Sequence, residues 1–328
     1  MSIKKVSSQL LITLLTLFFV STITVLSVPM GETTQSFGKL PHPFDFDGPA
    51  YPEPNLVFEG KFPKLPTKLM VYSVVEPNIT EDIVRALAKK HFGIANDAML
   101  MRSHRLRRYN LETINERFEM DPATGGFVFE KIEQDISQKV ANKVFPSKAQ
   151  CRGIAKAFLA SHSLLPPDAY LEERVADRSN SGVLGVRFGR KINGYEACGA
   201  GARLWVDINP DGEVVEVRKK WETLKPYKRY PIKSPQEALA ELQDGKGQLM
   251  NGCNGKIEKM TIRYYCSPQK QTFVQPIYFF EGVGPKRGFT GEVPAIKKEY
   301  LKSKEETIKE FIENQRKAGK LKRGQEPF

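Results

Sequence analysis

The sequence has few of the residues from which enzymes most often build their sites. Its 328 residues include four histidines, four cysteines and two tryptophans. It has no HExxH, GxSxG or CxxC motif, which are signatures of zinc peptidases, α/β-hydrolases and redox or zinc sites. Gly199-Ala200-Gly201 is too short for a phosphate-binding loop. These absences favour a protein without catalytic residues, metal or cofactor; a secreted hydrolase with an unrecognised site is an alternative.

Acidic residues are fewer than basic ones. The chain has 38 Asp and Glu against 50 Lys and Arg, a formal charge of +12. A basic surface attracts anionic partners, and the densest basic cluster consists of Arg102, Arg105, Arg107 and Arg108. The cluster predicts a binding site for an anionic cell-wall polymer or lipid head group. A solvated cationic face explains the same residues.

Long apolar runs are missing except near the N-terminus. Residues 1–28 contain Lys4 and Lys5, then an apolar run from Leu10 to Leu26. This pattern predicts a signal peptide, and the run is also close to the length of a membrane anchor. Either interpretation predicts a protein that is secreted, or membrane-anchored and facing outside, and so excludes nucleic acid as a partner. The proline-rich residues 29–66 are predicted to form an extended leader.

Cysteine is rare, but its four copies suit an oxidising compartment. Four cysteines allow three disulfide pairings. Cys253 and Cys266 are close in the sequence and could pair, which would leave Cys151 with Cys198. Free buried thiols are the alternative.

The most distinctive pattern that is present is a local unit that occurs three times. Helix starts are predicted at Thr80, Ser147 and Ser234, because each residue is a good N-cap and acidic or amide side chains follow in the first turn. Each start precedes runs of alternating residues separated by turn signals. The predicted units span 67–145, 146–232 and 233–294, and a charged helical tail spans 295–328. The expected fold class is α+β, with tandem units of a helix packed on a short antiparallel sheet.

The second unit has the clearest strands. Leu204, Val206 and Ile208 alternate with polar or amphipathic residues, as in a half-buried strand. The following residues 207–212 carry side-chain oxygens at alternate positions, as in the first half of a calcium loop. Position twelve of such a loop would be Arg218, where glutamate is needed. A β-turn explains these residues without a metal.

Several of these segments together resemble the PepSY-like extracytoplasmic modules. The resemblance is carried by the helix at 147–155, the strands at 186–195 and 206–214, the next helix at 232–239, and the strand at 275–280. Over 68–283 the chain looks closest to the tandem version in the YycH/YycI type of two-component regulatory protein. The resemblance implies a PepSY- or cystatin-like fold and a non-enzymatic regulatory role through protein–protein contacts at the cell surface.

Overall fold

The computed structural model describes residues 37–44, 54–95, 97–103, 108–132, 144–178 and 182–317. The predicted signal peptide or anchor lies outside these residues, as do Arg105 and Arg107. None of the described helices is both long and apolar enough to cross a membrane.

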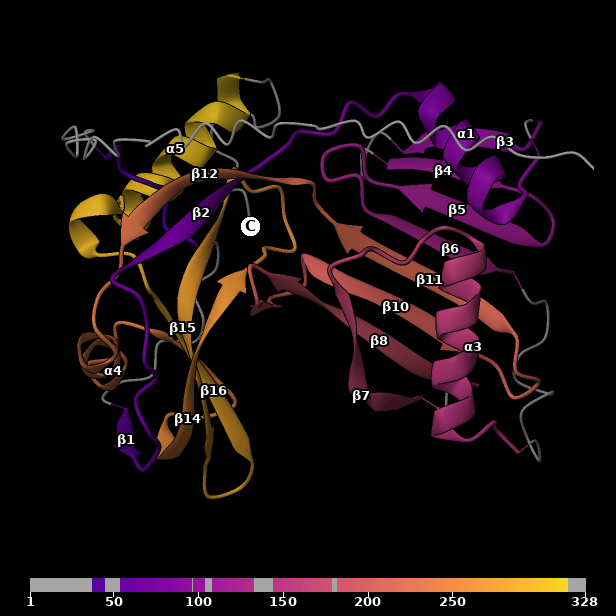
Figure 1. Ribbon diagram of the computed structural model, residues 1–328. Coiled ribbons are helices and arrows are strands. Elements are labelled where there is room, and N and C mark those ends of the chain that lie inside the picture. The colour runs from indigo at the N-terminus through magenta and orange to yellow at the C-terminus, as the bar shows by residue number, and fades with distance from the viewer. Residues whose placement is uncertain are drawn as a thin grey trace, which may run out of the picture. The chain divides into compact units, whose positions relative to one another are not determined.

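The described residues form α-helices, one 3-10 helix and sixteen β-strands (Figure 1). The helices are α1 (Glu81–Phe92), α3 (Lys148–Ser161), α4 (Pro235–Gln243), α5 (Lys304–Lys317) and the 3-10 helix Lys298–Tyr300. The strands up to α4 are β1 (Asn55–Phe58), β2 (Lys68–Val74), β3 (Met99–Ser103), β4 (Arg108–Glu112), β5 (Glu116–Met120), β6 (Phe127–Lys131), β7 (Ala169–Arg178), β8 (Val183–Ile192), β9 (Tyr195–Cys198), β10 (Ala202–Ile208), β11 (Val214–Trp221) and β12 (Leu224–Pro231). The last strands are β13 (Gln248–Met250), β14 (Asn254–Tyr265), β15 (Phe273–Val283) and β16 (Gly288–Pro294).

The three predicted helix starts are confirmed. The Thr80 side chain accepts a hydrogen bond from the Ile83 amide. Ser147 and Ser234 each form a full capping box, with Gln150 and Glu237 respectively. These contacts satisfy amides that a helix leaves unpaired in its first turn.

The predicted fold class is wrong, although most of its elements form where expected. The strands belong to one mixed sheet, with the order β12-β2-β15-β14-β9-β8-β10-β11-β6-β5-β4-β3 along its main path. β6 of the first predicted unit pairs with β11 of the second, so these two units share a sheet. Caps and alternation determine individual elements, whereas each strand edge must still find a partner for its backbone groups. In this protein the edge strands β6 and β11 pair with each other across the predicted boundary between the first and second units.

The sheet can be divided into two regions, and the chain starts in one, forms the other, and then returns to the first. We call residues 79–221 the inserted region, with α1, α3 and β3 to β11, and residues 37–74 together with 224–317 the enclosing region. β2 precedes the inserted region in sequence but pairs with β12 and β15, which follow it. β9 connects the two ladders, because it pairs with β8 and also lies parallel to the end of β14.

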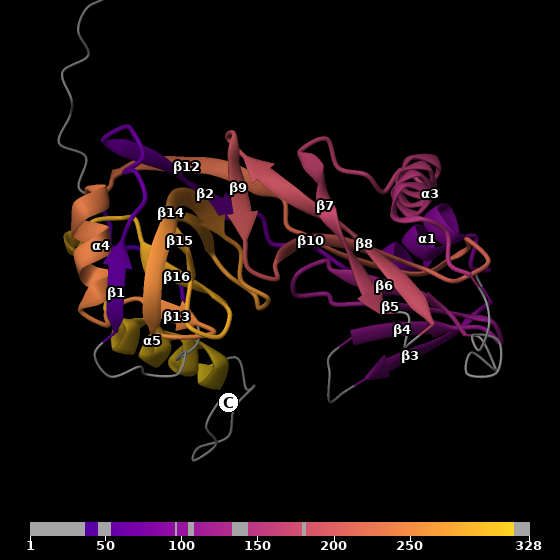
Figure 2. The ribbon, with the colours of Figure 1, turned by 90° about the horizontal axis from the view of Figure 1, so that it is seen from below.

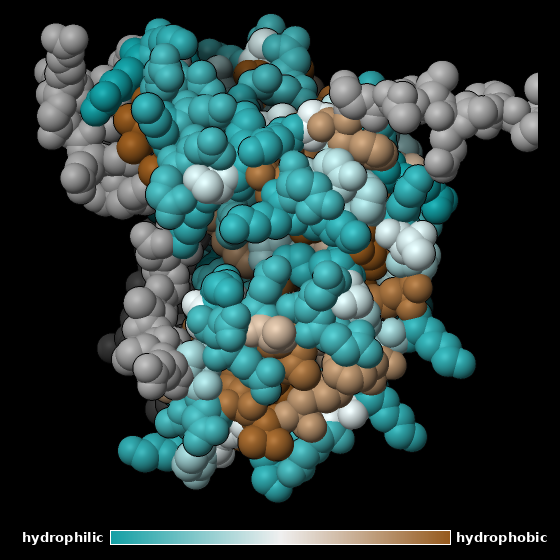
Figure 3. Space-filling model, turned by 90° about the vertical axis from the view of Figure 1, so that its left-hand side faces the viewer, coloured by the Kyte–Doolittle hydropathy of each residue, from teal (hydrophilic) through white to brown (hydrophobic). Residues whose placement is uncertain are grey.

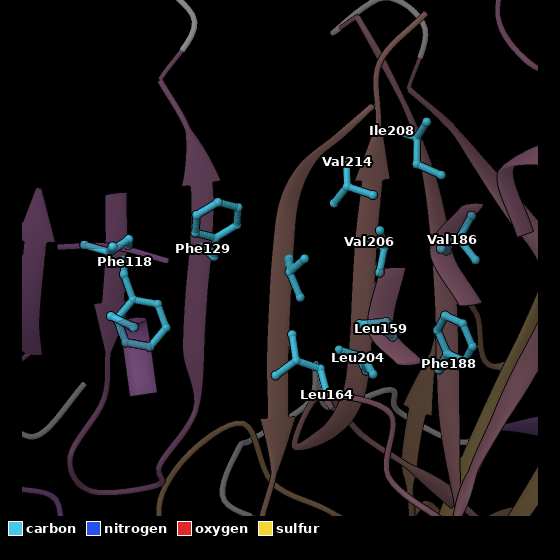
Figure 4. Close-up of a cluster of buried hydrophobic side chains, with 14 of the residues drawn as sticks. Phe118, Phe129, Leu159, Leu164, Val186, Phe188, Leu204, Val206, Ile208 and Val214 are labelled. Carbon is cyan, nitrogen blue, oxygen red and sulfur yellow. The ribbon is translucent and has the colours of Figure 1, made fainter. Parts of the chain in front are cut away.

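The core of the inserted region lies between its sheet and two helices. Leu204, Val206 and Ile208 are fully buried on the face covered by α3, as their alternation predicts. They pack in one cluster with Leu159 of α3 (Figure 4). Figure 2 shows α1 and α3 on the same side of this part of the sheet. Neither of these two described helices lies against the opposite face.

The enclosing region has its own core under α4. Ala238 and Leu242 of α4 pack with Phe280 and Val293 of the sheet. Part of the predicted leader joins this region, because Leu40 exchanges backbone hydrogen bonds with Tyr300 and Lys302. Apolar side chains also gather on the lower part of the face in Figure 3. The exposed apolar residues of the enclosing region include Val57 and Phe62.

The predicted disulfides do not form. All four cysteines are free: Cys151 is buried in α3, Cys198 ends β9, Cys253 is partly exposed and Cys266 is buried. Cys198 and Cys266 are neighbours through their backbones, since the Cys266 amide donates to the Cys198 carbonyl. Their side chains enter different apolar clusters. Both predicted pairings, Cys253 with Cys266 and Cys151 with Cys198, are therefore incorrect for this structure.

Candidate functional site: a cleft lined by two sheet faces

A cleft of about 950 Å³ is lined by strands of both regions. Helices α1 and α3 cover one face of the sheet in the inserted region, and α4 covers one face in the enclosing region. Residues of the opposite faces line the cleft. Apolar side chains alternate with polar ones along these strands, so the faces turned away from the two cores carry most of the charge. The volume lies in the range of ligand-binding pockets.

The wall from the inserted region combines charge with a tryptophan. Trp205 lines the cleft, and the Arg187 guanidinium carbon lies 3.9 Å from its ring centre. The indole N–H of Trp205 donates to Asp207, which also accepts from Arg178 at 2.6 Å. Burial raises the pKa of Asp207, opposed by these two partners. The cation–π contact and the carboxylate fix the indole in one orientation.

Tyr170 of β7 lines the same wall. Burial and the nearby carboxylates of Glu196 and Glu172 raise its pKa to about 12. Arg203 and Arg263 act in the opposite direction. Tyr170 is therefore a neutral hydroxyl at physiological pH, among charges of both signs.

The wall from the enclosing region is organised around Arg263 of β14. Its guanidinium carbon lies 3.7 Å from the ring centre of Phe279. One terminal nitrogen lies 3.3 Å from a Glu281 oxygen and 3.5 Å from a Glu196 oxygen. Arg263 thus links strand β15 to β9, the strand that joins the two ladders.

Glu292 of β16 is the most strongly perturbed carboxyl of the cleft. Its side chain lines the cleft but is only 3% exposed. Burial raises its pKa to about 7, with Arg263 opposing the shift. Nearby, burial and the Glu292 charge raise the pKa of the Cys198 thiol well above its ordinary value. Cys198 is therefore protonated at neutral pH, which is unsuited to a thiolate nucleophile.

Two members of the predicted arginine cluster, Arg102 and Arg108, are described, and they do not lie on one face of the sheet. Arg102 pairs with Tyr109 and lies over its ring at 5.5 Å. Arg108 occupies the next register position, opposite Ser103, and lines the cleft in an ion pair with Glu119. Because successive strand residues point to opposite faces, Arg102 and Arg108 lie on opposite sides of the sheet.

The segment with the calcium-like pattern forms a turn. The Gly212 amide donates to the Asn209 carbonyl, and the Asn209 side chain accepts from the Glu213 amide. Gly212 has the positive φ that such a turn requires. The carboxylate of Asp207, the first oxygen-bearing residue of the pattern, already accepts hydrogen bonds from Arg178 and Trp205. No group of three or more metal-ligating side chains occurs among the described residues.

Of the residues that line the cleft, sequence reasoning proposed Arg108 as a binding residue but not Tyr170, Trp205, Arg263 or Glu292. Arg203 and Trp205 alternate with the buried residues of β10 and line the cleft, so the amphipathic pattern was a usable signal for one wall. Tyr170 and Glu292 gave no such signal, because β7 has an irregular register and β16 was not predicted as a strand.

Comparison with known proteins finds distant structural matches, and two of them are described below. A crystal structure of an uncharacterized protein from Eubacterium rectale has a TM-score of 0.38 and 9% identity, covering 73% of this chain and 87% of that one. The Bacillus megaterium YpeB C-terminal domain has a TM-score of 0.36 and 15% identity, covering 67% of this chain and 95% of that one. No protein-family model and no curated protein matches the chain. At these TM-scores neither match assigns a fold, and the YycH/YycI resemblance stays a prediction.

Proposed function

We propose that the chain is a non-enzymatic, extracytoplasmic binding protein that holds a segment of a partner protein in the cleft. The observation that carries this proposal is the composition of its two walls, which present aromatic rings and charges of both signs. Tyr170, Trp205 and Phe279 supply the rings, with Arg203 and Arg263 among the cations. A polypeptide offers matching groups along its length, whereas an anionic polymer would leave the acidic lining residues unpaired.

The lining residues support binding over covalent catalysis. No histidine is among the described residues that line the cleft, and the one cysteine there, Cys198, is a protonated thiol. A nucleophile needs an adjacent base or a depressed pKa. The Cys198 thiol donates to the backbone carbonyl of Tyr264 at 3.7 Å, and its pKa is raised rather than depressed.

A photo-crosslinking experiment tests the proposal in cells that make the native chain. p-Benzoylphenylalanine is placed at Ala200, an exposed cleft residue, or at Ala240, an exposed residue of α4 outside the cleft. We expect irradiation to join one protein to position 200 and not to position 240. Equal products from both sites, or none from position 200, would contradict the proposal.

A steric block provides the matched control. Ala200→Trp should fill part of the cleft and reduce recovery of the crosslinked partner in a competition experiment, whereas Ala240→Trp should not. Raising the salt concentration separates the other candidate, a binder of anionic polymer. Binding through phosphate-like charges weakens steeply with salt, while a mixed aromatic and charged interface should weaken modestly.

A further inference from the structure

Glu292 occupies a fixed place at one end of the cleft. It lies in β16, with Phe279 of β15 on one side and Gln248 of β13 on the other. Directly paired residues of antiparallel strands point to the same face, and all three line the cleft. The carboxyl is thus held by two ladders and is directed to the space between the walls.

The Glu292 carboxyl has no partner of its own among the described residues. The charge of Arg263 opposes the rise in the pKa of Glu292. The Arg263 guanidinium, however, contacts Glu281 and Glu196 and stacks on Phe279. No described residue makes a hydrogen bond or ion pair with the Glu292 side chain. A buried carboxylate in this state is costly, which agrees with its pKa of about 7.

Gln248 provides a second unsatisfied acceptor beside it. The Gln248 side-chain oxygen is buried and has no hydrogen-bond partner. Buried polar atoms in native proteins are nearly always paired. Two neighbouring strands therefore present acceptors at paired positions, and no described residue donates a hydrogen bond to the Gln248 oxygen or to the Glu292 carboxyl.

We propose that Glu292 and Gln248 form a subsite for a primary ammonium group of the segment that the cleft binds. An ammonium carries three donors and the charge that complements the carboxylate. It is compact enough to approach both oxygens from the cleft, whereas a planar guanidinium would have to fit beside that of Arg263. The inference rests on the proposed function and specifies its ligand: a lysine side chain or a free amino terminus.

The groups around Glu292 set the expected pH dependence. Arg263 faces it from β14 and Cys198 from β9, while Glu196 and Glu281 are engaged by Arg263. The neighbours on β13 and β15, Gln248 and Phe279, are uncharged. With the carboxyl titrating near 7, a cation should bind better above this pH than below it.

Four short peptides serve as probes of the intact chain. Ac-Ala-Lys-Ala-NH2 is compared with the norleucine peptide Ac-Ala-Nle-Ala-NH2, which has the same carbon chain without the amine. Ac-Ala-Arg-Ala-NH2 and H-Ala-Nle-Ala-NH2 separate guanidinium and amino-terminal recognition. Affinities are measured by NMR titration between pH 5.5 and 8.5. We expect the lysine peptide to bind about tenfold more tightly than the norleucine peptide at pH 8.5, with the preference shrinking at pH 5.5. The amino-terminal peptide is compared at about pH 7.5, because a free amino terminus has largely lost its proton at pH 8.5.

Glu292→Gln should remove this preference and its pH dependence. Glu258→Gln is the matched control, because Glu258 of β14 is an exposed carboxyl that does not line the cleft; it should change affinity by less than about threefold. The subsite would be overturned by equal affinity for the lysine and norleucine peptides, or by no binding of any peptide. It would also be overturned if the arginine peptide bound best, or if Glu292→Gln kept the preference for the amine. The two proposals fail separately, since a crosslink at Ala200 that persists without amine preference rejects the subsite alone.

Discussion

Gly189 lies directly beneath the ring of Tyr170. A β-carbon at position 189 would come within 2.6 Å of the ring, closer than side-chain carbons approach one another. We predict that Gly189→Ala displaces Tyr170 and destabilises the chain by about 1–3 kcal/mol. The free energy of unfolding in urea measures the loss. An unchanged value would show that the ring does not rest on this glycine in solution.

Gly153 is the control for Gly189, because a β-carbon at position 153 would meet no neighbouring side chain. It lies in α3, and a β-carbon there meets no atom within 4 Å. Gly153→Ala should stabilise the chain by about 0.5–1 kcal/mol, because alanine is the better helix former. The same urea titration checks the sign. A loss comparable to that of Gly189→Ala would mean that any added methyl group is harmful.

Thiol labelling tests the state of the cysteines. Cys253 is partly exposed, whereas Cys151, Cys198 and Cys266 are buried. Burial also raises the pKa of all three buried thiols, that of Cys266 to about 12. We expect a thiol reagent to modify one cysteine in the native chain and four after unfolding without reductant. A count of two or fewer after unfolding would establish a disulfide.

His42 should make stability fall in acid. Burial and the charge of Lys304 lower its pKa from 6.5 to about 4. The native state therefore binds fewer protons than the unfolded state between these values, so stability is present above pH 6.5 and is lost as the pH falls to 4. We predict a loss of about 1–2 kcal/mol over this window. His42→Asn, which keeps an acceptor for the Phe44 amide, should flatten this part of the profile.

Glu292 should have the opposite slope. Its pKa is raised from 4.5 to about 7, so the native state binds more protons than the unfolded state in between, and stability falls as the pH rises through this window. At pH 8 Glu292→Gln should exceed the wild type in unfolding free energy by about 1–3 kcal/mol. At pH 4 the two should agree. Equal stability at both values would show that the carboxyl is well solvated.

The sequence predicted local structure well because its signals are local. A cap such as Ser147 and its partner Gln150 are three residues apart, and the alternation of Leu204 and Val206 requires only a strand. Such signals do not say which strand lies next in the sheet. The pairing of β6 with β11 depends on complementary edges and a shared core, and no short window contains both.

Pro276 shows how strand pairing that is distant in sequence changes the interpretation of a single residue. Proline in a strand suggests an edge or a bulge, yet β15 lies within the sheet. Its partner on one side changes from β2 to β16 around this proline, and the missing N–H is tolerated at the change. The cleft depends on the same long-range arrangement, which is why Glu292 and Tyr170 were not foreseen.

The early position of β2 in the chain affects how the protein is made. Leu69 of β2 pairs with Tyr230 of β12, and the whole inserted region lies between them in sequence. During synthesis from the N-terminus, β2 emerges before both of its partner strands, β12 and β15. Contacts this distant in sequence slow folding and leave strand edges open to misassembly. An early-emerging strand with no partner is a natural target for a chaperone, and truncation before β12 would leave it permanently exposed.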